Sequence, residues 1–225
     1  MADENSSSGL SQLARLLAAI FNSSWVEMLA EGWKLFRKLW RGWTNEGIYE
    51  VLEHHSTLEL LDRHGERAAV HKQQRVRFLQ NNILAYQDQA WGDGEILINY
   101  RCTPGVAVDR YRPGQKTYIL ISLREVKNKG DVDEFNIQWE MHHGFTRPTE
   151  LWAAEISHRT QWLKLDIIFP ESRPPIRTLL VIGSTQRTTP LGQGALKQLL
   201  DGRYLVTWET QHPRLYETYA IQWEW

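Results

Sequence analysis

The chain has 225 residues, enough for one large domain or for one domain with an appendage. Its 26 basic and 27 acidic residues leave a formal net charge of -1, which excludes a global attraction to nucleic acid or to anionic membranes. The single cysteine, Cys102, excludes an intramolecular disulfide framework, and the longest apolar runs fall short of the ~20 residues of a conventional membrane span. Because the acidic start also lacks the positive region of a signal peptide, we expect a cytoplasmic protein.

Residues 1–9 are polar and end in Ser6-Ser7-Ser8-Gly9, which predicts a disordered tail. From Leu10 to Phe21 the leucines and other apolar residues recur at helical spacing. Ser24 followed by Glu27 fits a capping box and predicts the start of a second helix, which the glycines from Gly42 onward end. The sequence therefore predicts an amphipathic helical arm over residues 10–46.

The predicted arm carries two stripes of side chains. The apolar stripe consists of Val26, Leu29, Trp33, Phe36, Trp40 and Trp43. The basic stripe beside it consists of Lys34, Arg37, Lys38 and Arg41. Indole rings beside cations are typical of a helix lying in a membrane interface, and the local charge of +3 over residues 10–43 favours anionic lipid. Packing on its own domain, or against copies from other chains, buries the same apolar stripe equally well, and neither excludes contact with a membrane.

From Gly47 to the end, about ten short apolar or alternating segments are separated by Gly, Pro, Asn and Asp turn signals, with no long helical pattern between them. This arrangement predicts a mainly β domain over residues 47–225, an antiparallel β-sandwich or, as the alternative, a barrel. Two segments alternate clearly. Over 162–169 the apolar residues face one way and Trp162, Lys164 and Asp166 the other. The last strand is predicted to place Tyr219, Ile221, Trp223 and Trp225 on one face.

The clearest strand pair is predicted around residues 116–141. Residues 117–123 are apolar and β-branched or aromatic, which is typical of a strand buried on both faces. Residues 127–131 contain Gly130 and predict a chain reversal, after which Phe135, Ile137, Trp139 and Met141 alternate with polar residues. We therefore predict an antiparallel hairpin at this point of the chain.

No motif for catalysis is found. No histidine is placed beside Cys102 by a recognisable motif, Ser184 lacks the flanking glycines of a nucleophile elbow, and no glycine-rich loop ends in Lys-Ser or Lys-Thr. We expect no catalytic residue and no cofactor, and we therefore favour an interaction module over an enzyme. The basic run from Arg63 to Arg77 lacks the stacking aromatics of single-strand binding, and we expect no nucleic acid partner.

Two metal sites remain as alternatives. The adjacent pairs His54-His55 and His142-His143 can each offer at most one ligand to a given zinc site, because neighbours on a strand face opposite ways. Calcium is the stronger alternative, because carboxylates gathered at one end of a sandwich supply the oxygens it needs. The candidate calcium ligands are Asp88, Asp93, Asp131 and Asp133.

The sequence favours a non-enzymatic module whose helical arm mediates self-association, docking on a protein partner, or peripheral binding to an anionic membrane. The alternative is a sandwich that binds a small ligand or calcium through its carboxylate-rich loops.

Overall fold

The computed structural model describes residues 47–225, and this part of the chain is almost entirely β. Its elements in chain order are β1 (Tyr49–Leu60), β2 (Arg67–Phe78), β3 (Ile83–Ala90), β4 (Glu95–Thr103), β5 (Val106–Tyr111), β6 (Thr117–Lys127), β7 (Val132–His142), β8 (Thr149–Glu155), β9 (Thr160–Phe169), β10 (Arg177–Ile182), β11 (Arg187–Pro190), the 3-10 turn η1 (Gln193–Ala195), β12 (Leu196–Gln198), β13 (Tyr204–Gln211) and β14 (Thr218–Glu224). Within this range no helix is long and apolar enough to cross a membrane. The predicted tail 1–9 and helical arm 10–46 lie outside the described residues.

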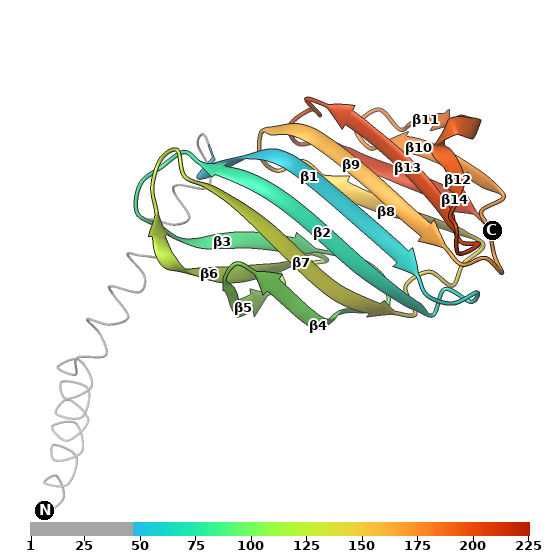
Figure 1. Ribbon diagram of the computed structural model, residues 1–225, viewed down its shortest axis with the longest axis horizontal. Coiled ribbons are helices and arrows are strands. Elements are labelled where there is room, and N and C mark those ends of the chain that lie inside the picture. Colours follow the sequence, from blue (N-terminus) through green and yellow to red (C-terminus); the bar gives the residue numbers. More distant parts are fainter. Residues whose placement is uncertain (1–46) are drawn as a thin grey trace, which may run out of the picture. The chain divides into compact units, whose positions relative to one another are not determined.

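The largest sheet has seven strands in the order β12-β13-β9-β1-β2-β7-β4 (Figure 1). Its neighbouring strands run antiparallel with one exception, since β1 and β9 are parallel. Parallel neighbours need a long connection, and here the whole of β2 to β8 lies between them in the chain. The prediction of a purely antiparallel sheet is wrong at this pair.

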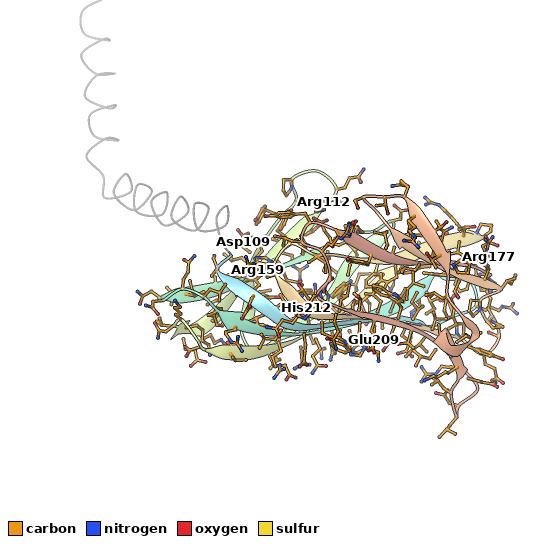
Figure 2. All side chains as sticks on the ribbon, turned by 90° about the horizontal axis from the view of Figure 1, so that it is seen from above. Asp109, Arg112, Arg159, Arg177, Glu209 and His212 are labelled. Carbon is orange, nitrogen blue, oxygen red and sulfur yellow. The ribbon has the colours of Figure 1, made fainter. Side chains whose placement is uncertain are left out.

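Two smaller sheets, β3-β6-β5 and β11-β10-β14-β8, form the second layer. Aromatic contacts join each of them to the large sheet. The ring of Tyr86 on β3 stacks on Phe135 of β7 with centroids 4.0 Å apart, and Phe169 of β9 meets Trp223 of β14 edge-on at 5.5 Å. Buried side chains fill the space between the layers (Figure 2). The domain is therefore sandwich-like, and none of its sheets closes into the barrel considered as the alternative.

The central hairpin prediction is wrong in its pairing. Both strands exist, as β6 and β7, but β6 pairs with β3 and β5 whereas β7 pairs with β2 and β4. The turn between them crosses from one layer to the other and is held to the end of β2, where Phe78 bonds backbone to backbone with Asp131 at 2.9 Å and with Gly130 at 2.8 Å. The apolar faces of β6 and β7 thus meet across the core, because burying them there removes more apolar surface from water than a flat two-stranded ribbon does.

The last strand, β14, lies in the interior of the four-stranded sheet between β10 and β8. Its apolar side chains face the core as the alternation predicts, with Ile221 and Trp223 fully buried and Tyr219 nearly so. Beyond the strand, the indole Nε1 of Trp225 donates to the carbonyl of Arg147 at 2.9 Å. The end of the chain is therefore bound into the sheet.

Replacing Trp223 by alanine tests the contribution of this strand to the core. The side chain is 0% exposed and contacts the rings of Phe145, Phe169 and Trp225. We expect Trp223→Ala to lower the free energy of unfolding by ~3–5 kcal/mol, through lost burial and a residual cavity. Urea unfolding followed by circular dichroism measures it, with the fully exposed Leu200→Ala as the control that stays within about 0.5 kcal/mol of the wild type. A Trp223→Ala protein as stable as the control contradicts the prediction.

Candidate functional site

The seven-stranded sheet has an inner face on the core and an outer face that carries polar side chains. Alternation along its four central strands decides which residue faces which way. The outer side chains of β1, β2, β7 and β9 include Glu53, His55, Thr57, His71, Gln73, Arg75, Glu134, Asn136, Gln138, Trp162, Lys164 and Asp166. Charges of both signs are interspersed on this face, so it has no strongly basic or strongly acidic patch.

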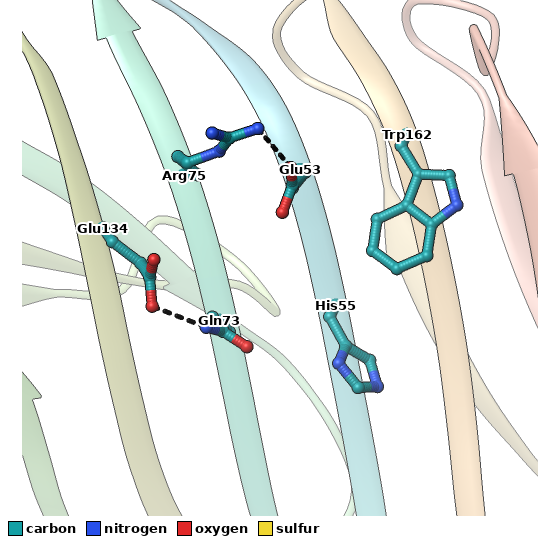
Figure 3. A pocket seen from close by; sticks show the side chains of 6 residues that line it. All are labelled: Glu53, His55, Gln73, Arg75, Glu134 and Trp162. Atoms are coloured by element: carbon teal, nitrogen blue, oxygen red, sulfur yellow. Dashed lines mark hydrogen bonds and ion pairs between the residues drawn. The ribbon is translucent and has the colours of Figure 1, made fainter.

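A pocket of about 210 Å³ opens on this outer face. It is lined by Glu53, His55, Gln73, Arg75, Glu134 and Trp162 (Figure 3). Four of these side chains form one row across β9, β1, β2 and β7, because each is the cross-strand partner of the next. His55 and Gln73 are partners in the adjacent row. The pocket is thus two neighbouring rows of the sheet, with an indole at one end and a carboxylate at the other.

Two cross-strand pairs hold the polar side chains of the pocket in place. Arg75 forms an ion pair with Glu53, and both are close to half exposed. The amide Nε2 of Gln73 donates to Oε1 of Glu134 at 2.6 Å. Each pair uses one carboxylate oxygen, so the second oxygens of Glu53 and Glu134 are left as acceptors. The amide oxygen of Gln73 is also left as an acceptor.

His55 is oriented by a buried carboxylate. Its Nε2 lies 2.7 Å from Oδ2 of Asp166. The same oxygen forms an ion pair with Nζ of Lys164 at 2.9 Å. The pKa of this carboxyl is lowered: burial opposes ionisation, but hydrogen bonds from His55, Thr207 and Lys164 outweigh it. An ionised carboxylate only accepts hydrogen bonds, so Nε2 of His55 carries a proton and donates a hydrogen bond to Asp166.

This arrangement does not form a nucleophilic relay. A relay needs a carboxylate on one imidazole nitrogen and a hydroxyl on the other. The Oγ1 of Thr57 lies 3.3 Å from the same Nε2 of His55 that binds Asp166. The geometry suits recognition through hydrogen bonds rather than activation of the Thr57 hydroxyl.

A bulge in β1 places Glu53 in the pocket. Its register against β2 shifts between Val51 and Glu53, so that Leu52 is the extra residue. Leu52 is buried, and the alternation resumes beyond it with Glu53 outward and His54 inward. Bulges commonly re-aim side chains beside binding sites.

The inner faces of β1 and β2 carry a buried polar network. Lys72 forms an ion pair with Asp88 of β3 and donates to the carbonyl of Gln89 at 3.2 Å. The hydroxyl of Tyr100 donates to the other carboxylate oxygen of Asp88 at 2.9 Å. Lys72 is 7% and Asp88 2% exposed, so both charges are inside the protein and are satisfied there.

A second part of this network involves His54. The amide oxygen of Gln74 accepts a hydrogen bond from the hydroxyl of Tyr86. The Nε2 of Gln74 donates a hydrogen bond to Nδ1 of His54 at 3.2 Å. Burial lowers the pKa of His54 to about 3, and the charge on Lys72 adds to the effect, with a smaller contribution from His55. His54 is therefore a neutral acceptor at physiological pH.

Cys102 is half-buried near the same network. Burial raises the pKa of its thiol to about 12, with the negative charge of Asp88 acting in the same direction. Since the thiolate is the nucleophilic form, this thiol is protonated and unreactive at neutral pH.

The four candidate calcium ligands are not brought together. Asp88 is in the core with Lys72, Asp93 pairs with Arg147 at 2.9 Å, and Asp133 pairs with Lys127 at 2.9 Å. Asp131 accepts the backbone N–H of Asn128 at 2.8 Å in the turn between β6 and β7. Within residues 47–225 no group of three or more His, Cys, Asp or Glu side chains is placed to hold a metal ion.

The predicted arm residues, from Val26 to Trp43, lie outside the described residues. Of the basic run, Lys72 is buried in its ion pair, and Arg75 and Arg77 pair with Glu53 and Glu50. The sequence pattern did not identify the pocket. Its residues lie on four strands, and the alternation over 162–169 predicted only that Trp162 faces outward.

Comparisons with known proteins give no family. No protein-family model and no curated protein matches the chain. Among solved structures, an M1 zinc metallopeptidase from Deinococcus radiodurans aligns with 77% of this chain at 7% identity and a TM-score of 0.46. A single-residue mutant of that enzyme aligns at 8% identity and a TM-score of 0.47, and so does the same mutant bound to a Tyr-Ser-Ala substrate. The chain covers 42% of those structures, and at this level of similarity neither fold family nor activity is carried over.

Double-mutant analysis tests the buried ion pair. Lys72→Met leaves the Asp88 carboxylate unpaired in the core, and we expect it to lower the free energy of unfolding by ~3–5 kcal/mol. The double variant Lys72→Met/Asp88→Leu removes both charges and is expected to lose less than the two single variants together. Urea unfolding measures all three proteins. Strict additivity of the two single effects contradicts a direct interaction.

The low pKa of His54 predicts a pH dependence of stability. Between pH 6.5 and about 3 the unfolded chain binds a proton at His54 that the folded protein does not, so the free energy of unfolding falls as the pH falls. We expect a contribution of up to about 1.4 kcal/mol per pH unit, which His54→Gln removes because the amide is uncharged and can still bond Gln74. Urea unfolding at pH 7, 6 and 5 gives the slope.

The exposed His71→Gln, on the adjacent strand, is the matched control and is expected to keep the wild-type slope. If His54→Gln and the wild type show the same slope, His54 does not titrate as the structure implies.

Proposed function

We propose that this chain is a non-enzymatic interaction module, in which a rigid β domain carries an arm that docks on other molecules. The observation that carries the proposal is the amphipathic pattern of residues 26–43, where three tryptophans and a phenylalanine share a stripe beside four cations. Such a stripe has to be covered by protein or by a membrane interface, because large apolar surfaces are costly in water.

The β domain supports the role of a scaffold. Its one thiol is held protonated, and the imidazole of His55 has both of its partners on one nitrogen. The polar side chains of its outer face are tied into cross-strand pairs. Groups fixed in this way suit recognition, which needs ordered partners more than reactive ones.

Membrane contact and protein contact make different demands on the arm. A peripheral membrane helix gains about 1 kcal/mol for each basic residue near an anionic surface, and that part of its binding weakens in salt. Self-association or docking on a protein depends mainly on the aromatic stripe. We propose the anionic membrane surface first, because the basic stripe lies directly beside the aromatic one.

The second candidate function is small-ligand binding by the β domain. The pocket on the outer face favours it, and calcium is not part of this candidate because the four proposed carboxylates have other partners.

Flotation with liposomes tests the proposal in the full-length chain. We expect flotation with anionic but not neutral vesicles, reduced by high salt. Both the triple variant Trp33→Ala/Trp40→Ala/Trp43→Ala and the variant in which Lys34, Arg37, Lys38 and Arg41 become glutamine are expected to lose about tenfold or more in binding. The matched charge control is Arg112→Gln/Lys129→Gln, on exposed positions of the β domain.

The alternative outcomes are also informative. If no variant floats and only the wild type forms an oligomer on size exclusion, the arm is a protein interface and the membrane part of the proposal is wrong. If neither flotation nor oligomer size responds to the triple variant, the arm is not the docking element.

A further inference from the structure

We propose that the pocket on the outer face of the seven-stranded sheet is a binding site for a neutral, hydroxyl-rich ligand, namely one sugar residue of a saccharide. This inference rests on the geometry of the β domain and is independent of the function proposed for the arm.

Trp162 supplies the apolar wall of the pocket. It stands on β9 at the end of the row Trp162, Glu53, Arg75, Glu134, and its side chain is only partly buried. The indole gives an otherwise polar pocket one apolar surface on which a ligand can pack. The C–H face of a pyranose ring is apolar and flat, so it can cover the indole while its hydroxyls point to the sides.

The other five side chains offer both donors and acceptors. Arg75 presents guanidinium N–H groups, whereas the amide oxygen of Gln73 is an acceptor. The Glu53 and Glu134 carboxylates add further acceptors beside the bonds they already make. Hydroxyl groups both donate and accept, so a polyol can satisfy this mixed set, which a purely donating or purely accepting ligand cannot.

The charge of the pocket disfavours an anionic ligand. Two carboxylates and one guanidinium line it, and the guanidinium is already paired with Glu53. A phosphate or carboxylate ligand would meet the unpaired charge of Glu134, which disfavours anions. A cationic amine is the rival class, because Glu134 and the indole of Trp162 both attract cations.

The size and rigidity of the pocket fit a single ring. A volume of 210 Å³ is below the range of about 300–1,000 Å³ usual for drug-sized ligands, so the pocket suits one ring rather than several. The four strands that carry the lining residues are all interior strands of the sheet. The polar rows continue on both sides, with Lys164 on β9 and Asn136 on β7, so the rest of a longer saccharide can lie along the open face.

Saturation-transfer NMR with the full-length protein tests this proposal. The probes are a panel of glucose, galactose, mannose and N-acetylglucosamine with short oligomers of each, choline as the cation, and inorganic phosphate as the anion. We expect one or more saccharides to bind, with an affinity that does not change with salt, because a neutral ligand has no screened charge. Trp162→Ala is expected to weaken that binding about tenfold or more, and Gln73→Ala to weaken it as well.

Gln211→Ala is the matched control, because Gln211 is an exposed cross-strand neighbour of Trp162 that does not line the pocket. It is expected to bind like the wild type, and thermal unfolding checks that each variant is folded. Three results would overturn the proposal: no saccharide binds, saccharide binding survives both pocket variants, or choline or phosphate binds the pocket in place of the sugars. A failed flotation experiment leaves this test unaffected, and the reverse also holds.

Discussion

The ion pair between Lys72 and Asp88 is the constraint on which the placement of the three-stranded sheet over the large sheet depends. Two charges in a core are tolerated only when other polar groups compensate for the hydrogen bonds to water that they lose. Here the carbonyl of Gln89 accepts from Lys72, and the hydroxyl of Tyr100 donates to Asp88. Lys72 belongs to the large sheet and Asp88 to the three-stranded sheet, so a slip of either strand by one residue would leave a buried charge unpaired. The pair therefore specifies which part of β3 lies over which part of β2, where apolar packing alone tolerates several registers.

The same constraint reaches the outer face through alternation along the strands. On β2, the inward Lys72 and Gln74 are followed directly by the outward Gln73 and Arg75. On β1, the inward His54 is followed by the outward His55. A backbone held in position by the buried network thus holds the pocket residues in position on the other side of the sheet. This is why a shallow surface pocket on these strands is preorganised, as a recognition site must be.

Strand positions and faces could be predicted from the sequence, but strand partners could not. The alternation of β7, β9 and β14 identified their inward residues, because apolar and polar residues alternate along a strand that buries one face. The pairing of β1 with β9, and the separation of β6 from β7 into different layers, depend on contacts between residues far apart in the chain. Asp88 shows the same limit, because it was predicted to be a calcium ligand in a loop, yet it lies in β3 and pairs with Lys72. The pocket needs four strands at once, so no local pattern could have shown it.

Hydrogen–deuterium exchange of the full-length chain, read by mass spectrometry for the wild type and for Lys72→Met, tests the role of the buried pair most directly. If the pair holds the three-stranded sheet on the large one, the variant will exchange faster in β3 and β6 and in the facing part of β2, while β10 and β14 keep their wild-type rates. A uniform increase over all strands would show that the charge only lowers global stability. Unchanged rates in β3 and β6 would contradict the account.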